Sequence, residues 1–145
     1  MKHALALLAL LAGCAAVPQP AIEPAGAPAP APAPAARVES IAVASLLHSA
    51  RSDTEAGQLA SAAASLERAI RIEPRNPRLW HELARVRLKQ GDYAQAESVA
   101  ARSNSWAGGD NALRAENWRL IARAREARGD AAGARAALDA AERQR

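Results

Sequence analysis

Few residues in this chain of 145 could carry out acid–base, nucleophilic or metal chemistry, and those few are scattered. The histidines, His3, His48 and His81, are far apart, and Cys14 is the single cysteine. No group of His, Cys and acidic residues has the spacing of metal ligands. No serine lies in a nucleophile-elbow pattern, and no glycine-rich loop has phosphate-binding spacing. The sequence therefore predicts a protein with no enzymatic activity, no metal and no cofactor.

Arginine, by contrast, recurs at regular positions. Arg51, Arg85 and Arg123 each stand six residues before a glycine. A guanidinium group presents its N–H donors in a planar fork that matches the two oxygens of a carboxylate. If the chain repeats one structural unit, these side chains would form a row that could bind an acidic partner. The alternative is that they are ordinary charges on an arginine-rich surface.

The glycines that follow these arginines mark an internal repeat. Gly57, Gly91 and Gly129 are separated by 34 and 38 residues. The residues around them are rich in Ala, Leu, Arg and Glu, which are strong helix formers. The aromatic residues that favour strands are scarce, with no Phe, one Tyr and three Trp in the chain. We therefore expect paired helices after residue 38.

The second and third repeats share a pattern of an aromatic residue, a large apolar residue, a small residue, a Gly-Asp turn and a second small residue. The positions in order are Trp80, Leu83, Ala84, Gly91-Asp92 and Ala96, and then Trp118, Ile121, Ala122, Gly129-Asp130 and Ala134. This pattern resembles the tetratricopeptide repeat, whose period is about 34 residues. The resemblance implies an all-α fold, a right-handed solenoid of three helix-turn-helix repeats with six antiparallel helices. The domain would span residues 39–145, with repeats at about 43–76, 77–110 and 115–145.

Several residues are expected to shape the turns and the core of these repeats. Each turn glycine can adopt the left-handed conformation that ends a helix, and Asp92 and Asp130 can cap the helices that follow. Asp110 or Asn111 can cap the helix after the second repeat. We expect the rings of Trp80 and Trp118 in the core.

In tetratricopeptide proteins the ligand lies in a concave groove lined by the first helix of each repeat. The resemblance implies that two rows of side chains face this groove: Arg51, Arg85 and Arg123, and, four positions further upstream, Leu47, His81 and Arg119. The hypothesis is a groove that receives an acidic or C-terminal segment of a partner. Trp106, between repeats two and three, either seals that junction or is an exposed binding hot spot. We include it among the candidate binding residues.

The N-terminal segment has the features of an export signal. A short basic start precedes nine apolar residues at 4–12, fewer than the ~20 that span a bilayer. Residues 11–14, Leu-Ala-Gly-Cys, resemble the bacterial lipobox. The resemblance implies cleavage after residue 13, diacylglycerol on the sulfur of Cys14 and acylation of the new amino terminus. Ala15 in place of Asp implies the outer membrane, facing the periplasm. The alternative is an ordinary signal peptide with a leftover thiol.

Residues 14–38 are expected to form a disordered tether between the lipid anchor and the helical domain. Seven prolines lie between Ala15 and Ala36, and proline lacks the N–H that helices and sheets require. An extended polyproline II chain of this length would reach roughly 70 Å. The alternative is a docking site for a proline-recognition module.

The net charge is +4, which in another setting would suggest nucleic acid, but the predicted export argues against that partner. Residues 102–106 and 117–122 resemble the pseudomonad outer-membrane lipoproteins that activate bifunctional penicillin-binding proteins. That resemblance implies an adaptor that stimulates peptidoglycan synthesis by direct contact with a penicillin-binding protein. A monomer is favoured, and the sequence leaves open whether a second copy covers the last helix. Two alternatives are an assembly lipoprotein of a type IV pilus or secretion system, and a passive module that binds glycan or lipid.

Overall fold

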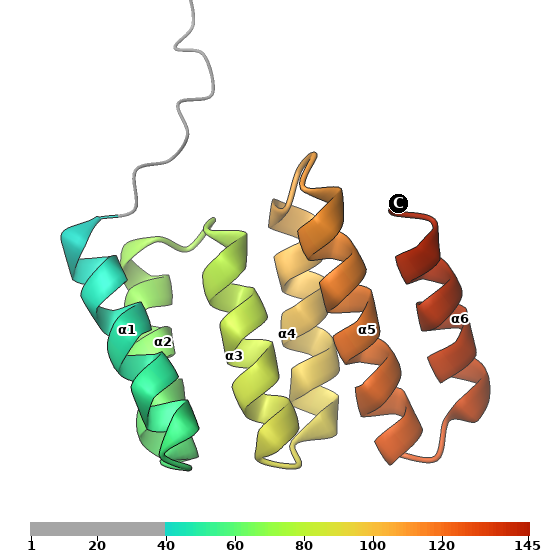
Figure 1. Ribbon diagram of the computed structural model, residues 1–145, viewed down its shortest axis with the longest axis horizontal. Helices are drawn as coiled ribbons and strands as arrows, with labels where there is room; N and C mark the ends of the chain where they lie inside the picture. The colour runs from blue at the N-terminus through green and yellow to red at the C-terminus, as the bar shows by residue number, and fades with distance from the viewer. Residues whose placement is uncertain (1–39) are drawn as a thin grey trace, which may run out of the picture. The chain divides into compact units, whose positions relative to one another are not determined.

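The computed structural model describes residues 40–145, which form six α-helices (Figure 1). In chain order these are α1 (Ile41–Glu55), α2 (Leu59–Ile72), α3 (Pro77–Lys89), α4 (Tyr93–Trp106), α5 (Asn111–Ala127) and α6 (Ala131–Glu142). The part of the chain that is described contains no strand, and the expected all-α class with six helices is confirmed. The predicted signal at 1–13, Cys14 and the tether at 14–38 lie outside the described residues.

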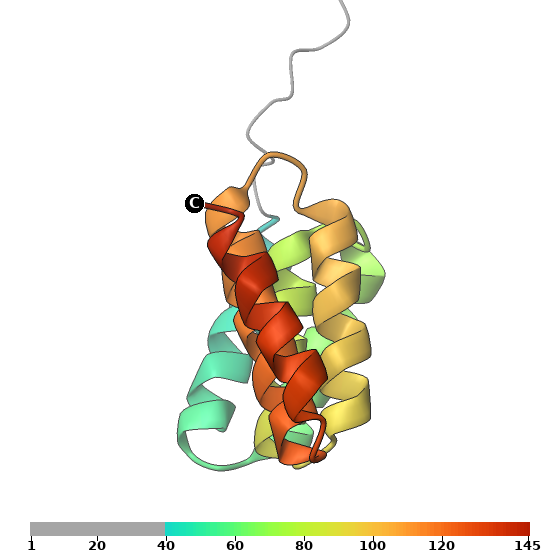
Figure 2. The same ribbon diagram turned by 90° about the vertical axis from the view of Figure 1, so that its right-hand side faces the viewer.

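The helices form three hairpins that stack side by side in chain order (Figure 1). Contacts run between consecutive helices, and α3 also contacts α5, the first helix of the next hairpin. Figure 2, which views the stack from its C-terminal end, shows α6 running antiparallel to α5. Within residues 40–145, none of these helices combines the length and the apolar character needed to cross a membrane.

The turns inside the hairpins follow the expected chemistry. Gly57, Gly91 and Gly129 have φ values of +76°, +80° and +82°, in the left-handed region that residues with a Cβ rarely adopt. The carboxylates of Asp92 and Asp130 accept hydrogen bonds from backbone N–H groups in the first turns of α4 and α6. At α5 the capping residue is Asp110, whose carboxylate accepts from the backbone N–H of Leu113.

The core is built largely from alanine and aliphatic side chains. One cluster fills the space between the first two hairpins and a second joins hairpins two and three. Their largest buried members are Leu47, Leu66, Leu79, Leu83, Leu120 and Ile121. Small residues at Ala84, Ala96, Ala122 and Ala134 are buried, as close helix approach requires. Trp118 is half-buried and packs on the second cluster. Trp80 is half-buried as well, and its indole N–H donates to the carbonyl of Pro74 at 2.8 Å.

The second and third hairpins each contain one partly buried arginine that forms an ion pair with the preceding hairpin. Arg87 on α3 donates from Nη2 to Oε1 of Glu67 on α2 at 2.6 Å. Arg125 on α5 donates from Nε and Nη2 to Oε1 of Glu97 on α4, at 2.8 and 2.6 Å. An ion pair therefore crosses each of the two hairpin junctions.

Candidate functional site

The first helices of the three hairpins line a hollowed, strongly charged surface. We call it the first-helix groove and define it by the charged and apolar residues around three adjoining hollows: Leu47, Ala50, Arg51, Glu55, Leu66, Arg78, His81, Glu82, Arg85, Val86, Lys89, Asp110, Ala112, Leu113, Glu116, Arg119, Leu120 and Arg123. Arg85 lines all three hollows. The structure thus brings together both rows of residues that the repeat register predicted, on α1, α3 and α5.

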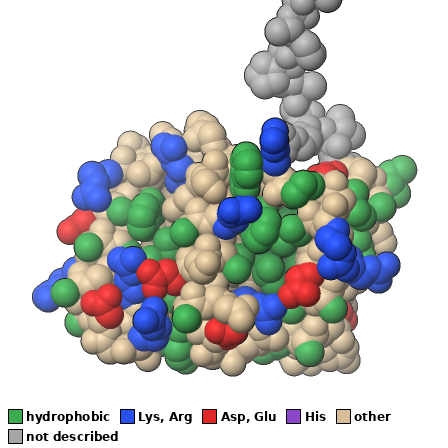
Figure 3. All heavy atoms as spheres, turned by 180° about the vertical axis from the view of Figure 1, so that it is seen from behind, with side chains coloured by type: hydrophobic (Ala, Val, Ile, Leu, Met, Phe, Trp, Pro, Cys, Tyr) green, Lys and Arg blue, Asp and Glu red, His purple; other side chains and the backbone are tan. Residues whose placement is uncertain are grey.

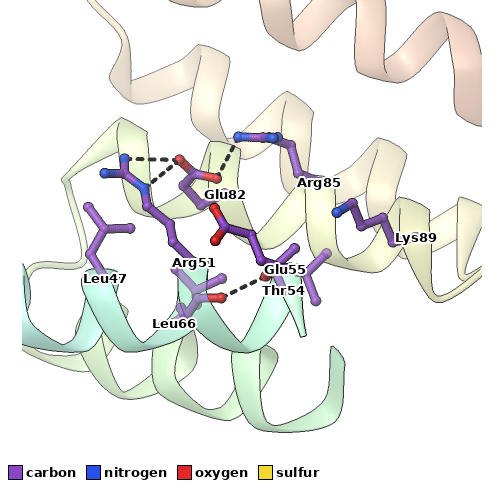
Figure 4. Close-up of a pocket in the computed structure, with 10 residues that line it drawn as sticks. Leu47, Arg51, Thr54, Glu55, Leu66, Glu82, Arg85 and Lys89 are labelled. Carbon is purple, nitrogen blue, oxygen red and sulfur yellow. Dashed lines mark hydrogen bonds and ion pairs between the residues drawn. The ribbon is translucent and has the colours of Figure 1, made fainter. Parts of the chain in front are cut away.

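The hollow between α1 and α3 contains a compact ion-pair network (Figure 4). Arg51 on α1 donates from Nε and Nη2 to Oε1 of Glu82 on α3, at 3.3 and 3.1 Å. Arg85, one turn along α3, donates from Nη1 to Oε2 of the same carboxylate at 3.0 Å. The side chain of Glu82 is only 13% exposed. Its carboxylate accepts hydrogen bonds from two of the three arginines in the predicted row.

The α5 side of the groove is different. Arg119 is half-buried and Arg123 is exposed, and both line one hollow together with His81, Arg85 and Glu116. Within residues 40–145, neither Arg119 nor Arg123 makes a side-chain hydrogen bond or ion pair. Their charges therefore face solvent without compensation from a bonded carboxylate.

His81 forms one wall of the groove and is held by a buried polar chain. Its Nδ1 lies 2.8 Å from Oδ1 of Asn117, and its Nε2 lies 3.6 Å from Oε2 of Glu116. The Asn117 amide donates from Nδ2 to Ser103 Oγ at 2.8 Å and to Asn104 Oδ1 at 2.9 Å. Asn117 and Ser103 are fully buried.

Because the Asn117 amide nitrogen is committed to Ser103 and Asn104, its oxygen must face His81. The Nδ1 atom of His81 is therefore the donor, and Nε2 is directed to the carboxylate of Glu116. Sequence reasoning missed Glu82, Asn117 and Ser103. Glu82 precedes Arg85 by three residues, a spacing typical of helical ion pairs, but nothing local in the sequence shows its contact with α1.

Trp106 lies at the end of α4, which is the second helix of its hairpin. It does not line the hollows of the first-helix groove. Trp106 is 37% exposed, and the guanidinium carbon of Arg75 stands 5.3 Å from the centroid of its ring. Arg102 stacks in the same way over Trp80, at 5.5 Å. Cation–π contacts of this kind stabilise an exposed ring by ~0.5–1 kcal/mol.

The face opposite the view of Figure 1 carries acidic and basic side chains interspersed with apolar ones (Figure 3). No single-sign patch stands out on that face.

Across residues 40–145, no three His, Cys or acidic side chains are close enough to hold a metal ion.

Comparison with known proteins places these features in a family. A family model described as tetratricopeptide repeat matches residues 53–116. The solved structure of the globular C-terminal domain of P. aeruginosa LpoP is similar to this chain, with 52% sequence identity and a TM-score of 0.70. The alignment covers 71% of this chain and 97% of that one. No significant match was found among curated protein sequences.

Proposed function

Since the chain belongs to the tetratricopeptide-repeat family that includes the C-terminal domain of LpoP, we propose that it is a non-catalytic adaptor of the bacterial envelope. The adaptor binds a protein partner through the first-helix groove. The observation that carries the proposal is the row of groove residues on α1, α3 and α5, in which Arg119 and Arg123 have no bonded partner within residues 40–145. Arginine is enriched at binding hot spots.

The partner is a penicillin-binding protein, whose synthesis of peptidoglycan the adaptor stimulates by contact. Two observations support this choice. The stretches 102–106 and 117–122 resemble lipoprotein activators of such synthases, and the identity with the LpoP domain is 52% over 97% of its length. The activity belongs to the synthase, and this chain supplies a binding surface.

The N-terminal residues supply the location. Acyl chains on Cys14 hold the protein at the outer membrane, because each buried methylene contributes ~0.8 kcal/mol and two or three chains bind firmly. The Pro/Ala-rich residues up to 38 form a tether that carries the helical domain into the periplasm, where a synthase anchored in the opposite membrane can be reached.

Cross-linking in intact cells tests the adaptor role. A photo-reactive residue is placed at exposed Arg123 in the groove, and a matched one at exposed Arg135 on α6 outside it. We expect a penicillin-binding synthase to be captured from position 123 and not from position 135. Capture of a secretin from position 123 would assign the protein to pilus or secretion assembly. Equal capture from both positions would remove the groove from the proposal.

A salt titration separates a protein partner from an anionic polymer. Binding to glycan or lipid headgroups by charge alone should collapse as salt shortens the Debye length from ~10 Å at 0.1 M to ~3 Å at 1 M. A groove that also buries apolar surface should keep measurable affinity for its protein partner under the same conditions.

A further inference from the structure

The two ends of the first-helix groove are electrostatically unequal. At the end between α1 and α3, Arg51 and Arg85 already hold the carboxylate of Glu82. At the α5 end, Arg119 and Arg123 hold no carboxylate within residues 40–145. One groove thus has an end whose arginines are occupied internally and an end whose arginines are available.

The hollow between α1 and α3 has an apolar floor and a rim that carries both charges. Its floor is formed by Leu47, Ala50, Leu66 and Val86. Glu55 and Glu82 stand at its edge together with Arg51, Arg85 and Lys89 (Figure 4). A second carboxylate entering here would lie beside Glu55 and Glu82 and would find both arginines engaged by Glu82, which leaves Lys89 as the one cation of this hollow without a bonded carboxylate within residues 40–145. An apolar side chain would instead bury its surface against the floor, which is favourable by ~25 cal/mol per Å².

The α5 end has the opposite preference. Arg119 and Arg123 are four residues apart on one helix, so they stand one turn from each other and repel. A carboxylate between them would relieve that repulsion and accept charge-assisted hydrogen bonds. Arg85 lines this hollow as well, from α3.

We propose, resting on the proposed function, that the groove binds an extended segment of a partner with a fixed polarity. An apolar residue enters the hollow between α1 and α3, and acidic residues lie over Arg119 and Arg123. Glu82 is the specificity-determining residue, because it occupies the arginines of the first hollow and directs carboxylates to α5. The hollow between α1 and α3 and the hollow between α3 and α5 are one helix spacing apart, and packed helices lie ~8–10 Å apart. An extended chain advances ~3.3 Å per residue. The apolar and acidic positions of the bound segment are therefore about three residues apart.

Selection from a random heptapeptide display library tests the proposal, using the full acylated chain in detergent micelles. We expect enrichment of peptides with one apolar residue and acidic residues about three positions away. A library with no enrichment, or with enriched basic residues, would overturn the proposal. On Arg119→Gln/Arg123→Gln the selected peptides should bind about tenfold more weakly, and a new selection should lose the acidic positions and keep the apolar one.

Glu82→Gln is the sharper variant, since it frees Arg51 and Arg85 with little change in shape. Selection on this variant should yield acidic residues at the position that was apolar. Glu55→Gln is the matched control, because it removes the same charge from the same rim without releasing an arginine; its peptides should match those of the unaltered chain. An identical shift with both variants, or no shift with Glu82→Gln, would overturn the role of Glu82. Folding of each variant is checked by circular dichroism.

The selection uses no cellular partner, so its outcome is separate from that of the cross-linking experiment. If position 123 captures a synthase in cells while the library shows no polarity, the adaptor role stands and the recognition rule is wrong. If the library shows the polarity while position 123 captures no synthase in cells, the recognition rule stands and the proposed partner is wrong.

Discussion

The Oδ1 atom of Asn117 on α5 lies 2.8 Å from Nδ1 of His81 on α3. Since Asn117 also donates to Ser103 and Asn104 on α4, one buried amide joins three helices. The chain continues to the backbone, because Ser103 Oγ donates to the carbonyl of Pro77 at 2.8 Å. This arrangement holds the groove-facing His81 ring through the core.

Asn117→Ala should therefore destabilise the domain strongly. The change leaves Oδ1 of Asn104 and Nδ1 of His81 without their partner, while Ser103 keeps its bond to Pro77. Unsatisfied buried polar groups cost ~1–3 kcal/mol each. We expect a loss of about 3 kcal/mol in the free energy of unfolding, measured by urea denaturation. Asn111→Ala, at an exposed position in the first turn of the same helix, should cost less than about 0.5 kcal/mol. Equal losses from the two changes would show that the buried network contributes nothing.

The turn between α5 and α6 offers a test of backbone conformation alone. An alanine Cβ at Gly129 would meet no atom within 4 Å, but φ there is +82°. Gly129→Ala should therefore cost ~1–2 kcal/mol through strain without a clash. Gly109→Ala is the control, because its Cβ also meets nothing and its φ is outside the left-handed region; it should change stability by less than about 0.5 kcal/mol. Thermal denaturation of both variants measures the difference.

The ion pair between Arg125 and Glu97 should couple α5 to α4 measurably. The two side chains are 29% and 23% exposed, so water screens them less than a surface pair. A double-mutant cycle using Arg125→Met and Glu97→Gln should give a coupling energy of about 1 kcal/mol. The same cycle on Arg145 and Glu142, which are 72% and 55% exposed, should give no more than about 0.5 kcal/mol. A larger coupling at the C-terminal pair would contradict this account of the hairpin junction.

The two tryptophans near the third hairpin should differ in their contribution to stability. Trp118 packs on the core cluster shared by hairpins two and three, so Trp118→Ala should cost roughly 3 kcal/mol. Trp106 is 37% exposed, and the guanidinium group of Arg75 stacks over its ring. Trp106→Ala should cost under about 1 kcal/mol. Because Trp106 lies outside the groove, its removal should also leave partner affinity unchanged, whereas a loss above about tenfold would assign it to the interface.

Much of the fold could be predicted from sequence because its determinants are local. The glycines at 34- and 38-residue spacing, the capping aspartates and the small residues each act within one hairpin, and they fixed the register of Arg51, Arg85 and Arg123. The six helices and the tetratricopeptide family are both confirmed.

What the sequence did not reveal depends on contacts between distant residues. Glu82 meets Arg51 across 31 positions, and His81 meets Asn117 across 36. The charge pattern alone could not distinguish Arg85, which is bonded to Glu82, from Arg123, which is not. The expectation that Trp80 and Trp118 lie in the core failed in part, because both residues are only half-buried and Trp80 donates to a local acceptor at Pro74.

The central claim is that partner recognition takes place in the first-helix groove. It is tested most directly by measuring the affinity of the captured synthase for Arg85→Glu/Arg123→Glu, with Arg68→Glu/Arg135→Glu as an equally charged control on exposed positions outside the groove. Circular dichroism confirms that both variants fold. We predict that the groove variant binds at least about tenfold more weakly, while the control binds like the unaltered chain. Unchanged affinity of the folded groove variant, or equal losses in both, would contradict the claim.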